Sequence, residues 1–185
     1  TASGGPFLDL PLSNFKKIKI KDAIKHPNWN MGKKISIDSA SMMNKVFEVI
    51  EAQRIFNIPI SKFQILIHPS SYVHAIVCFK NGISKVLIHE PDMKIPIYNA
   101  LYNNENNKKL TTKDIDFTKI NDLDFSKVNK LKFPTVNIIK KIPKNISLFE
   151  TVIVSANDSL VELFLQKKIR FLDIYKYLKI FSELH

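Results

Sequence analysis

Cysteine, arginine and glycine are all scarce in this 185-residue sequence. The single cysteine, Cys78, excludes an internal disulfide and is typical of a reducing compartment. Its neighbours are apolar, which predicts a small core residue rather than a nucleophile. No apolar run approaches the roughly 20 residues that a membrane-spanning helix needs, so a spanning protein is excluded.

The scarcity of arginine argues against reading the positive net charge as a sign of nucleic-acid binding. The sequence has 28 Lys and Arg against 17 Asp and Glu, and its formal net charge is +11. Only Arg54 and Arg170 are arginines, whereas nucleic-acid readers favour arginine because its planar fork pairs with phosphate and guanine. A basic module that binds nucleic acid or another polyanion remains the alternative function. A Lys/Asn/Ile-biased proteome, with lysine as the solubilising residue, explains the charge better.

The rest of the composition is typical of a globular chain. Hydrophobic residues make up 45% and charged residues 24%, which excludes a disordered or collagen-like protein. The length allows one domain, or one domain and a small second one. There is no initiator Met, and the sequence stops within an apolar-periodic stretch, so we expect a piece of a longer chain.

Periodicity and turn signals predict the local structure. Helical spacing is found over 14–25, from Asp38 to about Asn57, over 157–167 and over 172–184. β-Branched and apolar runs predict strands over 34–37, 63–68, 72–79 and 83–90. Asn81-Gly82 predicts a two-residue hairpin turn between the last two strands. The Asn-rich stretch from Asn103 to Lys109 predicts a linker or insertion.

Two loops contain residues that could bind a ligand. Backbone N–H groups in Ser3-Gly4-Gly5 could approach a phosphate, although glycines more often serve a plain turn. The loop His26-Pro27-Asn28-Trp29 has two interpretations. It is either a loop anchored by a buried Trp, or a lid whose Trp covers a ligand while the imidazole contacts an anion.

The helix expected after Asp38 has the most informative face. Ser39 is predicted at its N-terminus, where free N–H groups and the helix dipole favour an anion. Asn44, Lys45 and Glu48 are three and four residues apart, so their side chains should meet in one patch. Glu48 offers an oxygen ligand of the kind that Mg²⁺ or Mn²⁺ prefers. A solvated polar face with an incidental ion pair is the competing interpretation.

Several motifs together resemble one known family, 1-deoxy-D-xylulose 5-phosphate reductoisomerase. The motifs that carry the resemblance are Ser3-Gly4-Gly5-Pro6-Phe7, His26 to Gly32, Lys34 to Lys45, His68-Pro69, Tyr72-Val73-His74 and Glu90-Pro91-Asp92-Met93. The family converts 1-deoxy-D-xylulose 5-phosphate to 2-C-methyl-D-erythritol 4-phosphate. A divalent metal chelates the substrate during a retro-aldol and aldol rearrangement, and NADPH then reduces the aldehyde. A metal-dependent aldolase without redox chemistry is a weaker option.

The resemblance also implies roles for individual residues. The catalytic residues would be His26, Lys45 and Glu48. The substrate would contact Ser3, His26, Trp29, Ser39, Asn44, Lys45 and Glu48, mostly through its phosphate. Glu48 would bind Mg²⁺ or Mn²⁺ (or Co²⁺) with Glu51 in support, and Trp29 would close over the substrate. Met31, Gly32 and Met93 would lie at NADPH.

The expected fold is α/β. A catalytic domain over 1–101, with a mixed β-sheet backed by helices, would precede a linker over 102–130 and a small helical bundle over 131–185. The NADPH-binding domain and two metal carboxylates would lie upstream, so the piece alone should be inactive. The resemblance implies a homodimer, inhibitors of the fosmidomycin type, and neither nucleic-acid nor membrane partners. The Lys/Asn/Ile bias favours an apicomplexan plastid, the apicoplast, with a bacterial cytoplasm as the alternative.

Overall fold

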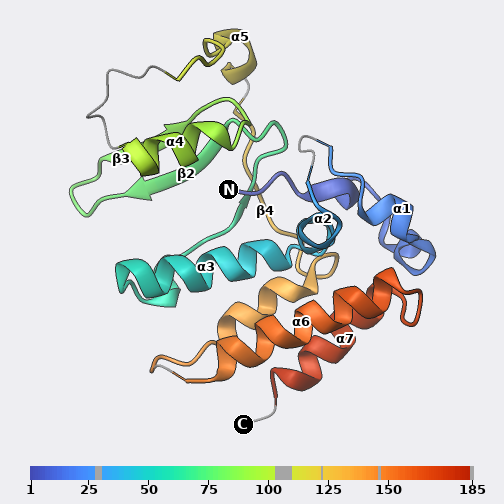
Figure 1. Ribbon diagram of the computed structural model, residues 1–185. Coiled ribbons are helices and arrows are strands. Elements are labelled where there is room, and N and C mark those ends of the chain that lie inside the picture. Colours follow the sequence, from blue (N-terminus) through green and yellow to red (C-terminus); the bar gives the residue numbers. More distant parts are fainter. Residues whose placement is uncertain (28–30, 103–109, 122, 146, 184–185) are drawn as a thin grey trace. The chain divides into compact units, whose positions relative to one another are not determined.

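The computed structural model describes residues 1–27, 31–102, 110–121, 123–145 and 147–183. The chain divides into two compact units (Figure 1). The smaller unit consists of Thr1–Ser3 and Leu66–Ser126, and the larger of Gly4–Ile65 and Lys127–His185. None of the described helices combines the length and apolarity needed to cross a lipid bilayer.

The larger unit is built from helices. Its α-helices are α1 (Ile20–Ala23), α2 (Lys33–Ala40), α3 (Met43–Phe56), α6 (Phe149–Leu165) and α7 (Phe171–Phe181). Its 3₁₀ helices are η1 (Gly5–Phe7), η2 (Leu12–Lys17), η3 (Ile60–Lys62) and η4 (Pro134–Lys141). Helix α6 packs against α7 and α2, while α3 packs against α2 and η4. The helices expected after residue 157 are confirmed, and the helix expected over 14–25 is divided into η2 and α1.

A cluster of phenylalanines joins four elements of the larger unit. The Phe7 and Phe171 rings meet edge to face with centroids 5.2 Å apart, and Phe15 lies 5.8 Å from Phe7. Phe164 of α6 meets Phe171 of α7 at 5.8 Å. All four rings are buried. Edge-to-face aromatic contacts add to the free energy gained from apolar burial, so this cluster fixes η1 and η2 on the α6–α7 pair.

The strand predicted over 34–37 is wrong, because these residues form part of α2. A four-residue apolar run does not distinguish a strand from a buried helical turn. The helix places Lys34 one turn before Asp38, and their side chains form an ion pair at 2.7 Å. It also turns Asp38 toward α6, where Asn157 Nδ2 donates to the carboxylate at 2.8 Å. A contact between residues 119 positions apart is absent from any local pattern.

The expected start of a helix at Asp38–Ser41 is also wrong. Helix α2 ends at Ala40 and α3 begins at Met43, because Met42 between them adopts a left-handed φ of 64°. The Ser41 hydroxyl accepts a hydrogen bond from the Met43 amide at 3.4 Å. Helix α3 ends at Phe56, close to the expected end at Asn57. Asp38 and Ser39 therefore lie within a helix rather than at its N-terminus.

The smaller unit contains an antiparallel hairpin of β2 (Val73–Cys78) and β3 (Ser84–Ile88). Val73 pairs with Ile88 and Cys78 with Ser84, and the register shifts once near the start of β2. The hairpin is confirmed, but the two-residue turn is wrong. The Phe79 amide donates to the Ile83 carbonyl at 2.8 Å, and Gly82 carries the left-handed φ of 87° that closes the longer loop.

The hairpin leaves Cys78 exposed, so the expected core position is wrong. The last two residues of β2, Val77 and Cys78, are exposed, and an apolar neighbourhood in sequence does not ensure a covering layer. The unit's other elements are β1 (Leu66–Ile67), α4 (Lys94–Tyr102), α5 (Phe117–Ile120) and β4 (Ser126–Lys127) at its boundary. Strand β1 pairs with β4. The predicted insertion Asn103–Lys109 lies outside the described residues.

The fold class agrees with the prediction only in its coarse form. The chain is helix-rich and contains β structure, and its described residues after 131 form helices, as expected. The strands of the described residues form only two-stranded sheets, β1–β4 and β2–β3. The expected mixed sheet is therefore not seen in this part of the chain.

Candidate functional site

Helix α3 presents the predicted polar patch. Asn44 Nδ2 donates to Glu48 Oε1 at 2.7 Å. Lys45 Nζ donates to both Glu48 oxygens, at 2.9 and 2.8 Å. The geometry expected from the spacing is confirmed: an amide, an ammonium and a carboxylate share one exposed face. Because this ion pair is exposed, it contributes little to stability, which leaves these groups free to exchange partners with a ligand.

His26 lies near this patch. Burial lowers the pKa of its imidazole, and the positive charge of Lys45 lowers it further. This electrostatic effect shows that two predicted site residues lie close together although their segments are separate in the sequence. A neutral imidazole beside an ammonium is suited to an anion, because a bound negative charge would favour protonation of the ring.

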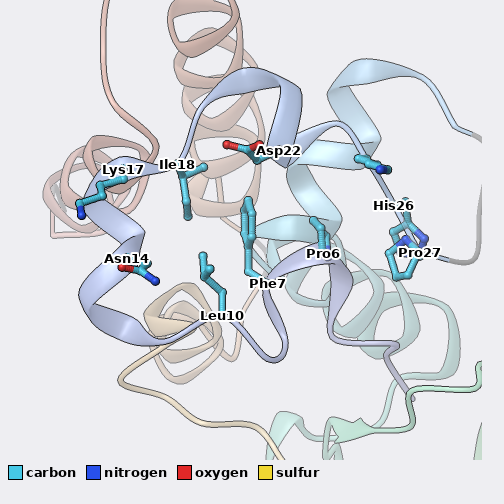
Figure 2. A pocket seen from close by; sticks show the side chains of 10 residues that line it. Pro6, Phe7, Leu10, Asn14, Lys17, Ile18, Asp22, His26 and Pro27 are labelled. Carbon is cyan, nitrogen blue, oxygen red and sulfur yellow. The ribbon is translucent and has the colours of Figure 1, made fainter.

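His26 also lines a hollow of about 840 Å³, within the range typical of ligand pockets (Figure 2). Figure 2 shows side chains from η1, η2 and α1 around it. Its polar lining includes Asn14, Lys17, Asp22 and Lys25, and its apolar lining includes Phe7. The sequence reasoning missed these polar residues, since nothing in the sequence distinguishes Lys17 and Lys25 from the other lysines.

The glycines of the first motif have a structural task. Gly4 and Gly5 adopt left-handed φ angles of 88° and 63°. A Cβ on Gly5 would lie 2.9 Å from the carbonyl oxygen of Ser39, so only glycine lets this turn approach the end of α2. The turn interpretation is sufficient for both glycines. Ser3, the motif's first residue, belongs to the smaller unit and is half-buried.

Ser39 is not at a helix N-terminus. It lies in the last turn of α2 and is half-buried, so the dipole argument for an anion at this hydroxyl is wrong. The N-terminus of α2 is capped instead by Gly32, whose φ of −60° is open to any residue. A Cβ there would meet nothing within 4 Å. The backbone does not require glycine at this position, and the open space suits close approach of a ligand.

The remaining predicted residues belong to different elements. Met31 is half-buried. Met93 precedes α4 in the smaller unit and is 54% exposed. Glu51 is exposed one turn after Glu48, while Trp29 lies outside the described residues. Within the described ranges, no group of three or more His, Cys, Asp or Glu could hold a metal ion. The donor type of Glu48 fits Mg²⁺, but the donor number does not.

The fold and the patch define a helix-rich domain with a polar site suited to an anionic ligand. Comparison with known families is more specific. Models of the 1-deoxy-D-xylulose 5-phosphate reductoisomerase C-terminal domain and the DXP reductoisomerase C-terminal domain match residues 1–56 and 88–183. The chain belongs to the 1-deoxy-D-xylulose 5-phosphate reductoisomerase family.

Individual relatives agree with this assignment. The chain is 57% identical over 174 residues to the reductoisomerase of Pelagibacter ubique, and 44% identical over 176 residues to that of Sulfurihydrogenibium. These matches cover 94% and 95% of this chain but 45% and 47% of the relatives. The chain therefore spans about half the length of the curated relatives it matches.

Solved structures show the same relation. A DOX-P reductoisomerase in complex with NADPH, fosmidomycin and magnesium has a TM-score of 0.90 and 35% identity over 99% of this chain and 45% of its own. The reductoisomerase of Zymomonas mobilis in complex with NADPH has a TM-score of 0.88 and 37% identity over 100% of this chain and 47% of its own.

Proposed function

We propose that this chain is the catalytic and C-terminal part of an enzyme that converts 1-deoxy-D-xylulose 5-phosphate to 2-C-methyl-D-erythritol 4-phosphate, using NADPH and a divalent metal. This reaction supplies isoprenoid precursors by the non-mevalonate route. The observation that carries the proposal is the Asn44–Lys45–Glu48 patch beside His26. The patch lies in a chain that matches a 1-deoxy-D-xylulose 5-phosphate reductoisomerase over 94% of the chain's own length.

The patch favours a phosphorylated substrate. Lys45 and His26 would face the phosphate, with Asn44, Ser39 and Ser3 as further donors. Phosphate binding would replace the intramolecular Lys45–Glu48 contact, at little cost because that pair is exposed. His26 would gain a proton as the anion arrives, so it would act as a donor to the substrate rather than as a fixed charge.

Glu48 is the proposed metal ligand, with Glu51 in support. The described residues offer too few oxygens for a complete Mg²⁺, Mn²⁺ or Co²⁺ site, so the remaining ligands would come from residues outside the described part. Met31, Gly32 and Met93 are the proposed contacts of NADPH, and Trp29 the proposed lid. The open space at Gly32 supports close approach of the cofactor.

We further propose the domain division 1–101, 102–130 and 131–185, with a mixed β-sheet in the first domain, and a homodimer. Inhibitors of the fosmidomycin type would bind the same site. The plastid location stays a prediction. The curated relatives named above are bacterial, which favours the alternative, a bacterial cytoplasm.

The test is NADPH oxidation by the complete protein encoded by its gene, with 1-deoxy-D-xylulose 5-phosphate and Mg²⁺. Turnover should require all three, and Glu48→Gln should lower kcat/KM at least about 100-fold, since it removes charge at the reacting oxygens. The matched control is Glu162→Gln, an exposed glutamate of α6, which should be neutral. Turnover without NADPH, or an unaffected Glu48→Gln, would contradict the proposal.

Two controls address the other options. The 185-residue chain alone should be inactive, and turnover by it would overturn the expected dependence on further residues. The polyanion-binding alternative is not favoured by the family match. An electrophoretic shift of nucleic acid at physiological salt would revive it, because only specific or multiply charged contacts survive screening.

A further inference from the structure

A second hollow of the larger unit, of about 620 Å³, lies between the segment around α1 and the α6–α7 connection. Its floor is apolar and made of side chains that are half-buried or buried: Ile18, Ile20, Ile24, Phe164 and Ile169. Its other lining residues are four exposed cations: Lys19, Lys21, Lys167 and Arg170. None of these residues is one that the family resemblance assigns.

The charged residues that line this hollow are all positive. Its lining includes no carboxylate. Arg170 is held by Asp173 through two hydrogen bonds of 3.1 Å. Among the described residues, no ion pair joins Lys19, Lys21 or Lys167 to a carboxylate. Three ammonium groups that form no ion pair among the described residues therefore line an apolar hollow, where low-dielectric walls strengthen the attraction for an anion.

Lys167 adds an independent observation. It adopts a left-handed φ of 61° just after α6, a position that favours glycine. Its amide donates to the Phe164 carbonyl at 2.9 Å, so the turn is ordered. A lysine is less favourable than glycine at such a position, and this helix-ending turn fixes the backbone from which the Lys167 side chain lines the hollow.

We propose that this hollow binds an anionic amphiphile, a small molecule with a carboxylate or phosphate head and an aliphatic tail. The lysines would hold the head, and the four isoleucines with Phe164 would cover the tail. Single-stranded nucleic acid is a poorer match, because base stacking needs exposed aromatic faces and the one aromatic ring here is 3% exposed.

Calorimetric titration of the complete protein tests this proposal, with decanoate and decyl phosphate as probes. Both should bind, whereas 1-decanol, which has the tail without the charge, should bind at least about tenfold more weakly, the equivalent of one charge-assisted hydrogen bond. Tighter binding of decyl phosphate would identify a phosphate head as the native one, and tighter binding of decanoate a carboxylate. Absence of binding by both anions, or equal binding of decanol, would overturn the proposal.

Substitutions distinguish binding of the anion in this hollow from general attraction of the anion to a basic protein. Lys21→Gln with Lys167→Gly removes two of the cations, and glycine suits the left-handed backbone, so the fold should persist. Affinity for decanoate should fall at least about tenfold. The matched control is Lys62→Gln with Lys168→Gln, which removes two exposed lysines outside the hollow and should change affinity less than about twofold. An equal loss in the control would show non-specific charge and overturn the site.

Discussion

The two units of this chain differ in how completely they cover their apolar side chains. In the larger unit, Ile153, Ile174 and Leu178 are 0–1% exposed. In the hairpin of the smaller unit, Val77, Val86 and Leu87 are 46–54% exposed. A two-stranded hairpin alone is marginally stable in water. The free energy of folding within this chain is therefore concentrated in the helical unit, which also holds the candidate patch.

Truncating one leucine in each unit gives the largest expected contrast. Leu178→Ala removes a fully buried side chain and should lower the free energy of unfolding by about 2–5 kcal/mol, because it loses apolar burial and leaves a cavity. Leu87→Ala, at a half-exposed position, should cost less than about 1 kcal/mol. Urea unfolding, followed by hydrogen exchange in each unit, measures both. Equal costs would refute the concentration of stability in the helical unit.

Two glycines with left-handed backbones sharpen the comparison. Gly5→Ala should cost about 3 kcal/mol, since alanine adds backbone strain and its Cβ would press against the Ser39 carbonyl. Gly82→Ala in the hairpin meets nothing within 4 Å and should cost about 1 kcal/mol of strain alone. Denaturant midpoints of the two variants give the measurement, and a larger loss for Gly82→Ala would contradict this account.

Substitution of Asn157 tests the buried hydrogen bond between Asn157 and Asp38 in the larger unit. Burial raises the pKa of Asp38, although Lys34 and Asn157 both donate to its carboxylate. Asn157→Ala would remove one donor and cost about 2 kcal/mol at neutral pH. The cost should shrink as the pH falls through the Asp38 pKa, because a protonated carboxyl needs that donor less. Urea titrations at several pH values measure this, and Gln166→Ala, at an exposed amide of the same chain segment, is the control.

A cost for Asn157→Ala that is independent of pH would contradict the assignment of the donor to Asp38. The direction of the Asp38 pKa shift also determines how its contribution to the stability of the unsubstituted chain changes with pH. An acid whose pKa is raised by folding stabilises the folded state most at low pH, and that contribution is lost as the pH rises from the unfolded-state value through the folded one.

Local spacing was sufficient for the patch but not for the elements around it. Asn44, Lys45 and Glu48 meet because helical geometry alone brings positions three and four apart together. The strand expected over 34–37 failed because a short apolar run does not distinguish a strand from a buried helical turn, and the packing of α2 on α3, α6 and η1 lies outside any short window. The break at Met42 was equally inaccessible, since a methionine with a left-handed φ leaves no turn signature in sequence.

The same limit applies to the site. The spacing of Lys45 and Glu48 says nothing about His26, whose proximity to Lys45 is a tertiary contact between segments that are separate in the sequence. Family motifs placed these residues in one list without explaining their juxtaposition. Cys78 illustrates the reverse error: apolar neighbours along β2 predicted burial, but exposure depends on whether another layer packs over the strand.

The smallest expected effect concerns His26, in the larger unit. Burial and then the Lys45 charge lower its pKa, so folding favours the neutral ring. Its contribution to stability is fully present above the unfolded-state value of about 6.5 and is lost as the pH falls toward the folded value. Lys45→Met should raise the pKa of His26 only part of the way back, because burial remains the larger cause. NMR titration of the imidazole measures the shift, and Lys62→Met, which removes an exposed lysine elsewhere in the unit, should leave it unchanged. A full return to the ordinary value would show that charge, not burial, governs this imidazole.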